Sequence, residues 1–282
     1  MSAEGVRKYG FATSRWSSPS SSPRPSKGLP FGCVLLMLAL SVGCVTTTTE
    51  GGPAPAAERA VAQRNLGLDY LSHGNTSMAI RKLQEALEFA PDDAETLLWL
   101  GEGYRRKGRL EDAQVYMERA LLRSPRSHIV RLNLSGLYIQ LERYDDSITQ
   151  SNVLVEDVTF ATPWQALNNR GWAELQSGRL DAAEASFSEA LDYQPRYWPS
   201  RLNLGILASQ RGQKRKAIEH FNEVLERGPD AFAFAEANYR IGEVYIAWGH
   251  RDKAMEYFLA AVEDSPYSSW GTQSRSYLDQ LD

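Results

Sequence analysis

Histidine and cysteine are the side chains in this sequence best suited to binding a metal or to nucleophilic catalysis. The chain of 282 residues contains four histidines and two cysteines: His73, His128, His220, His250, Cys33 and Cys44. No two of them lie at metal-ligand spacing within a shared helix or turn. The serines, histidines and aspartates also lack the Gly-x-Ser-x-Gly turn that exposes a catalytic serine. We therefore expect no metal, no cofactor and no enzymatic activity.

Two further motifs could bind phosphate or transfer protons, and both have a structural explanation. The stretch "GEGYRRKG", residues 101–108, looks like a glycine-rich phosphate loop, but no strand precedes it, as such a loop requires. Adjacent acids occur at Glu111 and Asp112 and at Asp145 and Asp146, where negative charge favours the start of a helix. We interpret all of these residues as structural.

Cys44 is the residue whose position does predict covalent chemistry. It ends the uncharged, apolar stretch "FGCVLLMLALSVGC", which follows a basic front. This run is too short to cross a bilayer as a helix and is typical of a secretory signal peptide. Its end, "LSVGC", resembles the bacterial lipobox, with Ser41 where leucine is commonest. The resemblance implies that residues 1–43 are a signal peptide cleaved before Cys44, and that the thiol and the new amino terminus are acylated with palmitate-like chains.

Residues 44–59 are predicted to be a flexible tether. Threonine, glycine, proline and alanine dominate this stretch, and it cannot bury enough apolar surface to fold. The whole chain has a net charge of −4, and the five basic side chains and one acid of residues 1–43 leave the remainder near −8. That balance argues against nucleic acid as a partner.

The rest of the chain repeats one pattern of small residues. A first column, which we call the small-residue column, contains Gly67, Gly101, Ser135, Gly171, Gly205 and Gly242, spaced 34, 34, 36, 34 and 37 apart. Two other columns keep the same five spacings: Ala79, Ala113, Ser147, Ala183, Ala217 and Ala254, and then Ala86, Ala120, Leu154, Ala190, Val224 and Ala261. Columns that share insertions indicate six copies of one unit. Each unit is predicted to be two helices that cross closely at the small residues.

The unit resembles the tetratricopeptide repeat. The family's order of Leu-Gly, Tyr, Ala, Ala and Pro is present in "NLGLDY…AIRKLQEAL…P" and "RIGEVY…AMEYFLAAV…P". The resemblance covers residues 60–268 and implies an all-α superhelical solenoid of six repeats, at 60–93, 94–127, 128–163, 164–197, 198–234 and 235–268. A terminal repeat needs a polar cover, so residues 269–282 are predicted to form a capping helix.

In this family the first helices of successive repeats line a concave groove. Projection onto that geometry gives ten predicted groove residues: Leu68, Leu71, Leu98, Leu132, Ile139, Trp172, Leu175, Leu202, Ile206 and Tyr239. Packing between repeats is the alternative position for several of them, and Leu68 and Leu71 are expected to be exposed because no repeat precedes them. An apolar groove suits an apolar segment or helix of a protein partner and no small-molecule substrate.

A lipobox, a short polar tether and six repeats together resemble the type IV pilus pilotins, the PilF, PilW and Tgl group. The stretch "TPWQALNNRGWAEL", residues 162–175, is similar to the helix after the longer third junction of that group. The resemblance implies an outer-membrane lipoprotein, its repeats in the periplasm, that binds a secretin subunit and promotes secretin assembly. Val45 favours the outer membrane, because aspartate after the lipidated cysteine commonly signals inner-membrane retention. The alternative is an envelope scaffold that recruits peptidoglycan-modifying enzymes.

Overall fold

The computed structural model describes residues 55–281, which form thirteen α-helices and no β-strand. The helices are α1 (Ala56–Ser72), α2 (Thr76–Phe89), α3 (Ala94–Arg106), α4 (Leu110–Arg123), α5 (His128–Gln140), α6 (Tyr144–Glu156), α7 (Pro163–Gln176), α8 (Leu180–Tyr193), α9 (Trp198–Gln210), α10 (Lys214–Arg227), α11 (Ala231–Trp248), α12 (Arg251–Asp264) and α13 (Ser269–Leu281). Within this described part, no helix combines the length and apolarity that a membrane span needs. The predicted signal peptide and Cys44 lie outside the described residues and stay predictions.

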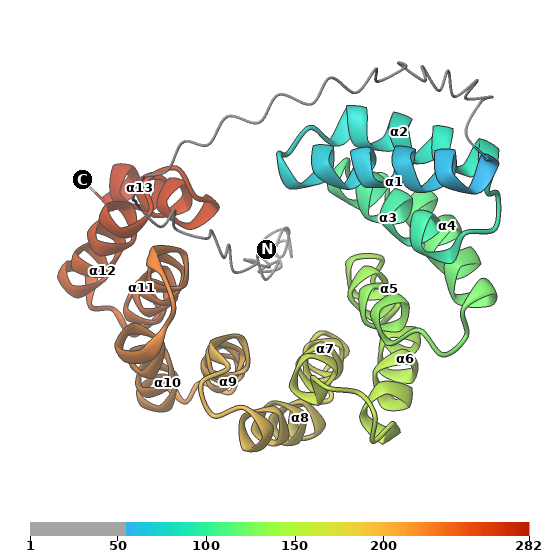
Figure 1. The fold of residues 1–282 in the computed structure, drawn as a ribbon. Helices are drawn as coiled ribbons and strands as arrows, with labels where there is room; N and C mark the ends of the chain where they lie inside the picture. The colour runs from blue at the N-terminus through green and yellow to red at the C-terminus, as the bar shows by residue number, and fades with distance from the viewer. Residues whose placement is uncertain (1–54, 282) are drawn as a thin grey trace, which may run out of the picture. The chain divides into compact units, whose positions relative to one another are not determined.

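The first twelve helices pair into six helical hairpins, and each hairpin packs on the next. Figure 1 shows the hairpins following one another along an arc, with α5, α7, α9 and α11 on its inner side and α6, α8, α10 and α12 on its outer side. We call α1, α3, α5, α7, α9 and α11 the first helices. The last helix, α13, packs on α12 and α11. The predicted all-α solenoid of six repeats with a closing helix is confirmed.

The small-residue column lets the two helices of each hairpin approach closely. A Cβ atom added to Gly205 would lie 2.4 Å from the ring of Phe221, and one added to Gly171 would lie 2.7 Å from the ring of Phe187. In the third repeat both partners change, because Ser135 stands in the column and the residue opposite is Ser151, which is also fully buried. The sequence pattern therefore records a pairing of a small with a large side chain across five of the six hairpins, and of two serines across the third.

The turn inside each hairpin requires a left-handed backbone. Five of the six turns place glycine there, at Gly74, Gly108, Gly178, Gly212 and Gly249, with φ between 71° and 83°. The third repeat has Glu142 instead, with φ 59°, and among the described residues it alone has a positive φ without being glycine. A residue with a Cβ atom is strained in this conformation. The packing around the third turn must therefore hold Glu142 at a positive φ that glutamate does not favour.

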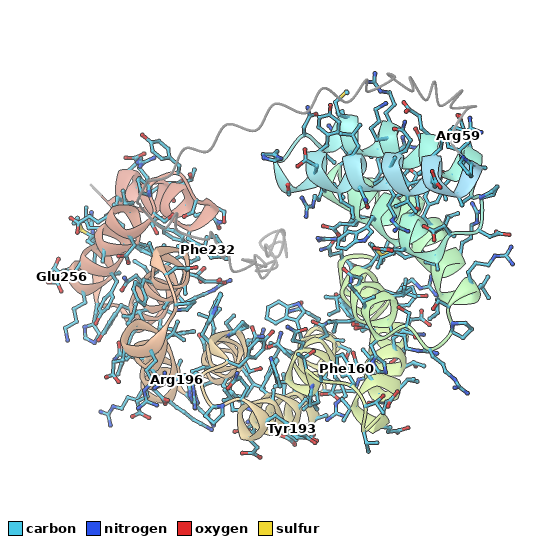
Figure 2. The ribbon with its side chains drawn as sticks, viewed as in Figure 1. Arg59, Phe160, Tyr193, Arg196, Phe232 and Glu256 are labelled. Atoms are coloured by element: carbon cyan, nitrogen blue, oxygen red, sulfur yellow. The ribbon has the colours of Figure 1, made fainter. Side chains whose placement is uncertain are left out.

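The structure corrects three of the predicted boundaries, one of them by a single residue, since α7 begins at Pro163 inside the predicted third repeat. The tether was predicted to run to residue 59, but α1 already begins at Ala56, because two alanines and Glu58 favour a first helical turn. Arg59, labelled in Figure 2, also lies 4.4 Å above the ring of Phe89 and is held in the fold. The fifth repeat was predicted to end at residue 234, but α11 begins at Ala231, where Asp230 caps its first turn.

The two ends of the solenoid are covered differently. At the C-terminal end Trp270 of α13 is buried and lies 5.3 Å from the ring of Tyr239, as expected of a capping helix. At the N-terminal end α1 is the first helix of the described residues. Leu66 is therefore 39% exposed, whereas Leu100 and Leu134, its equivalents in the next two repeats, are fully buried.

Candidate protein-binding surface

Helical periodicity divides the surface of each first helix into sides. The small-residue column faces the second helix of the same hairpin, and the residue before it, such as Leu100, faces the preceding repeat. Successive residues are separated by about 100° around the helix. Three positions lie about 100–160° from the column, measured around the helix axis. They are the residue after the column residue, the second residue before it and the sixth residue before it. That side is covered neither by the hairpin partner nor by the preceding repeat, so it is where a binding surface on the inside of the arc is expected.

Most of the ten predicted groove residues do not reach that surface. The buried ones are Leu71, Leu98, Ile139, Trp172, Leu175, Leu202, Ile206 and Tyr239, whereas Leu68 and Leu132 are half-buried. The expectation that Leu71 is exposed was wrong, since 4% of it is accessible. Residues four after or three before the column lie only about 40–60° from it and turn towards the following repeat. Trp172 and Ile206 are covered because α5, α7, α9 and α11 contact one another along the inside of the arc.

An accessible apolar surface is nevertheless present on the first three repeats. It consists of Val61 and Leu68 on α1, Trp99 on α3 and Ile129 on α5, with Leu132, three residues before the column on α5, at its edge, and we call these five residues the apolar stripe. Val61 is 43% exposed and Ile129 is 48% exposed, and the other three are half-buried. Sequence reasoning missed Val61, Trp99 and Ile129, although counting two or six residues back from the small-residue column would have found them.

The charged residues beside the apolar stripe neutralise one another. The carboxylate of Glu102 accepts hydrogen bonds of 2.7 and 2.8 Å from Arg105 and one of 2.7 Å from Arg106. Burial alone would raise the pKa of Glu102, but these guanidinium groups outweigh it and lower the pKa. Arg106 also donates to the backbone oxygen of Leu71, 2.8 Å away, which ties the second repeat to the first. An apolar partner would therefore meet no unpaired carboxylate at this level.

On the later repeats the apolar residues of this side, Trp172 and Ile206, are covered, and polar residues lie at or beside it. Asn168 accepts hydrogen bonds of 3.0 Å from Ser200 and from Asn203, which joins the fourth repeat to the fifth. In the sixth repeat Glu236 is buried, 4.0 Å from Arg240. Burial raises the pKa of Glu236 to about 7, against the opposing effect of Arg240. The apolar stripe therefore ends at the third repeat.

The histidines have structural surroundings. His73 and His250 lie in turns, as predicted. His128 lies 2.7 Å from the carboxylate of Asp157 and packs edge-on against Phe160, labelled in Figure 2. Hydrogen bonds from Thr159 and His128 lower the pKa of Asp157. In residues 55–281 no three histidine, cysteine or acidic side chains gather as a metal site would require.

Models of the tetratricopeptide repeat match residues 64–116, 102–157, 174–234 and 235–266. Among curated relatives, the type IV pilus assembly protein PilF of Pseudomonas aeruginosa is 26% identical over 162 residues, which are 55% of this chain and 64% of PilF. The Hsp70-Hsp90 organising protein of Plasmodium falciparum is 24% identical over 149 residues, which are 52% of this chain and 58% of that protein. The matched stretch is thus less than two thirds of either relative.

Solved structures show the same fold. PilW, a type IV pilus biogenesis factor, superposes with a TM-score of 0.65 at 23% identity, covering 76% of this chain and 97% of that chain. PilF of Pseudomonas aeruginosa superposes with a TM-score of 0.60 at 21% identity, covering 79% of this chain and 99% of that chain. With six helical hairpins and repeat models that match most of the described residues, this chain belongs to the tetratricopeptide repeat family.

Proposed function

We propose that this chain is a lipid-anchored, non-enzymatic protein of the bacterial outer membrane that acts as a type IV pilus pilotin. Cys44 carries the lipid, and the repeats bind an apolar segment of a secretin subunit before that subunit inserts into the membrane as part of a ring. The similarity to PilF and PilW supports the pilus system. The lipobox-like "LSVGC" supports the anchor.

The apolar stripe is the observation that carries the binding proposal. Its five residues lie on three successive first helices, and Glu102, Arg105 and Arg106 of the middle one, α3, are already paired with one another. A surface of this kind favours a partner segment with apolar side chains at helical spacing, because burial of those side chains supplies the affinity. The stripe also lies in the repeats closest to the tether in sequence.

A deletion experiment in cells tests the proposed function. Removal of the gene is expected to abolish heat-resistant secretin multimers while the secretin subunit is still made, because unassisted subunits do not assemble in the outer membrane. Reintroduction of the full chain restores the multimers. Normal multimers in the deletion strain would refute the pilotin proposal. Crosslinking from Trp99 to a peptidoglycan-modifying enzyme would then favour the envelope scaffold.

A further inference from the structure

A surface pocket lies between α9 and α10, in a repeat that the apolar stripe does not reach. We propose that the pocket between the turn before α9 and the end of α10 binds the carboxylate of an acidic side chain from a protein segment. The inference rests on a comparison of two repeats within this chain, and it does not depend on the pilotin proposal.

The second repeat has a carboxylate at the equivalent place. In the turn before α3, the side chain of Asp92 lies 2.8 Å from the guanidinium of Arg123, near the end of α4. The next residue, Asp93, caps α3 by accepting from the backbone N–H of Thr96, 3.0 Å away, and it also pairs with Arg64 at 3.1 Å. Two carboxylates thus satisfy both the arginine and the start of the helix.

The fifth repeat lacks both carboxylates. The residues equivalent to Asp92 and Asp93 are Arg196 and Tyr197, and the residue equivalent to Arg123 is again an arginine, Arg227. Helix α9 accordingly begins without a side-chain cap. Neither Arg196 nor Arg227 makes an ion pair with an acid in the described part of the chain. Two cations therefore stand where the second repeat has an ion pair.

These residues line one shallow surface pocket, whose cavity volume is about 10 Å³. Arg196, labelled in Figure 2, and Arg227 lie at its edge and are exposed. Arg201 also lines it but is engaged by Glu223, 3.3 Å away, the one acidic residue of the pocket. The rings of Tyr197 and Trp198 contribute apolar walls, and burial raises the pKa of the Tyr197 hydroxyl to about 12.

The chemistry of the pocket fits one kind of ligand. The residues that line the pocket have a net positive charge. A planar carboxylate can accept hydrogen bonds from two guanidinium groups at once. The uncapped start of α9 adds the backbone N–H of Trp198, which favours an anion, whereas Pro199 has no N–H. The pocket is a shallow depression that can take little more than a carboxylate group, so an apolar neighbour of the acidic side chain would lie on the open surface against Trp198. The position of Asp92 in the second repeat indicates where that carboxylate would sit.

Binding of short peptides to the full chain tests the proposal. The probes are a labelled, acetylated and amidated peptide Ala-Phe-Glu-Ala-Ala and the same peptide with glutamine in place of glutamate. Fluorescence anisotropy should show about tenfold tighter binding of the glutamate peptide. Only this peptide carries a negative charge with which Arg196 and Arg227 can pair. The variant Arg196→Asp should lose this preference, since the new carboxylate would pair with Arg227 as Asp92 pairs with Arg123.

The matched control is Arg126→Asp. Arg126 occupies the same turn position between the second and third repeats and is exposed, but Asp157 stands there in place of Arg227. This control should keep the preference for glutamate.

The two pocket variants have further expected results. The melting temperature of Arg196→Asp should rise by about 2 °C. Arg227→Gln, the second variant, should also lose the preference for glutamate.

Three results would overturn the proposal. Equal binding of the two peptides by the wild-type chain, or no binding of either at about 1 mM, would exclude a carboxylate site. Retention of the preference in both folded variants would place the site elsewhere. Displacement of the glutamate peptide by inorganic phosphate at equal concentration would identify a general oxyanion site instead of one for an acidic side chain.

Discussion

Replacement of Gly205 by alanine tests the close crossing of α9 and α10. The added Cβ atom would lie 2.4 Å from one carbon of the Phe221 ring and 2.7 Å from the next. Phe221 is only 1% exposed, so its ring is enclosed by the core and cannot turn away without moving other side chains. The helices must therefore separate or the ring must leave its preferred rotamer.

The size of the effect follows from two opposing contributions. Alanine stabilises the interior of a helix by about 1 kcal/mol relative to glycine. Overpacking of a filled core costs about 1–3 kcal/mol, and a contact as short as that with Phe221 belongs at the upper end of this range. We expect the free energy of unfolding of Gly205→Ala to fall by about 1–2 kcal/mol.

Urea denaturation of the purified protein, followed by circular dichroism, measures this change. Gly136→Ala is the matched control, because its added Cβ atom would have Asn169 as its nearest neighbour, 3.9 Å away, and should stabilise α5 by up to about 1 kcal/mol. In a Phe221→Ala background the ring is gone, so Gly205→Ala should stabilise the protein there. Equal effects of Gly205→Ala and Gly136→Ala in the wild-type background would refute the packing argument.

Three further predictions concern single residues. Glu142→Gly should raise the free energy of unfolding by about 0.5–1 kcal/mol in urea denaturation, because it relieves the strain of φ 59°. Burial raises the pKa of Glu236 to about 7 from a usual value of 4.5, so the folded state keeps a proton that the unfolded state releases between these pH values. Stability should therefore fall as pH rises from about 4.5 to 7.5, by about 3 kcal/mol more in the wild type than in Glu236→Gln, and equal pH profiles would contradict this. Cys44→Ala should abolish labelling with radioactive palmitate and release the protein from membranes on fractionation, and unchanged membrane retention would argue against the lipid anchor.

The repeat architecture was predictable because it depends on spacing. Gly171 and Gly205 lie in a column that two other columns repeat with the same insertions, and a shared insertion cannot arise from one helix alone. The structure adds what each column position touches, such as the Phe187 and Phe221 rings opposite those glycines.

The binding surface was predictable only in part. Apolar type and helical spacing selected Leu98 and Leu175 as readily as Leu68, but the first two are buried under the following repeat. How closely adjacent first helices approach depends on all the side chains between them, and a single sequence does not give that distance. Trp99 and Ile129, which lie at accessible positions of α3 and α5, were overlooked. Leucines on the same helices already satisfied the apolar spacing that was used for the prediction.

The affinity of the purified protein for the secretin subunit tests the central proposal most directly. Ile129→Asp places a carboxylate in the third-repeat part of the apolar stripe at a site that is 48% exposed, so the protein should still fold. Leu122→Asp is the control, because Leu122 is 78% exposed on α4 and lies outside the stripe. The account predicts that Ile129→Asp weakens secretin binding at least about tenfold, since docking would bury an unpaired charge, and that Leu122→Asp binds like the wild type. Equal affinities of the wild type and folded Ile129→Asp would contradict it.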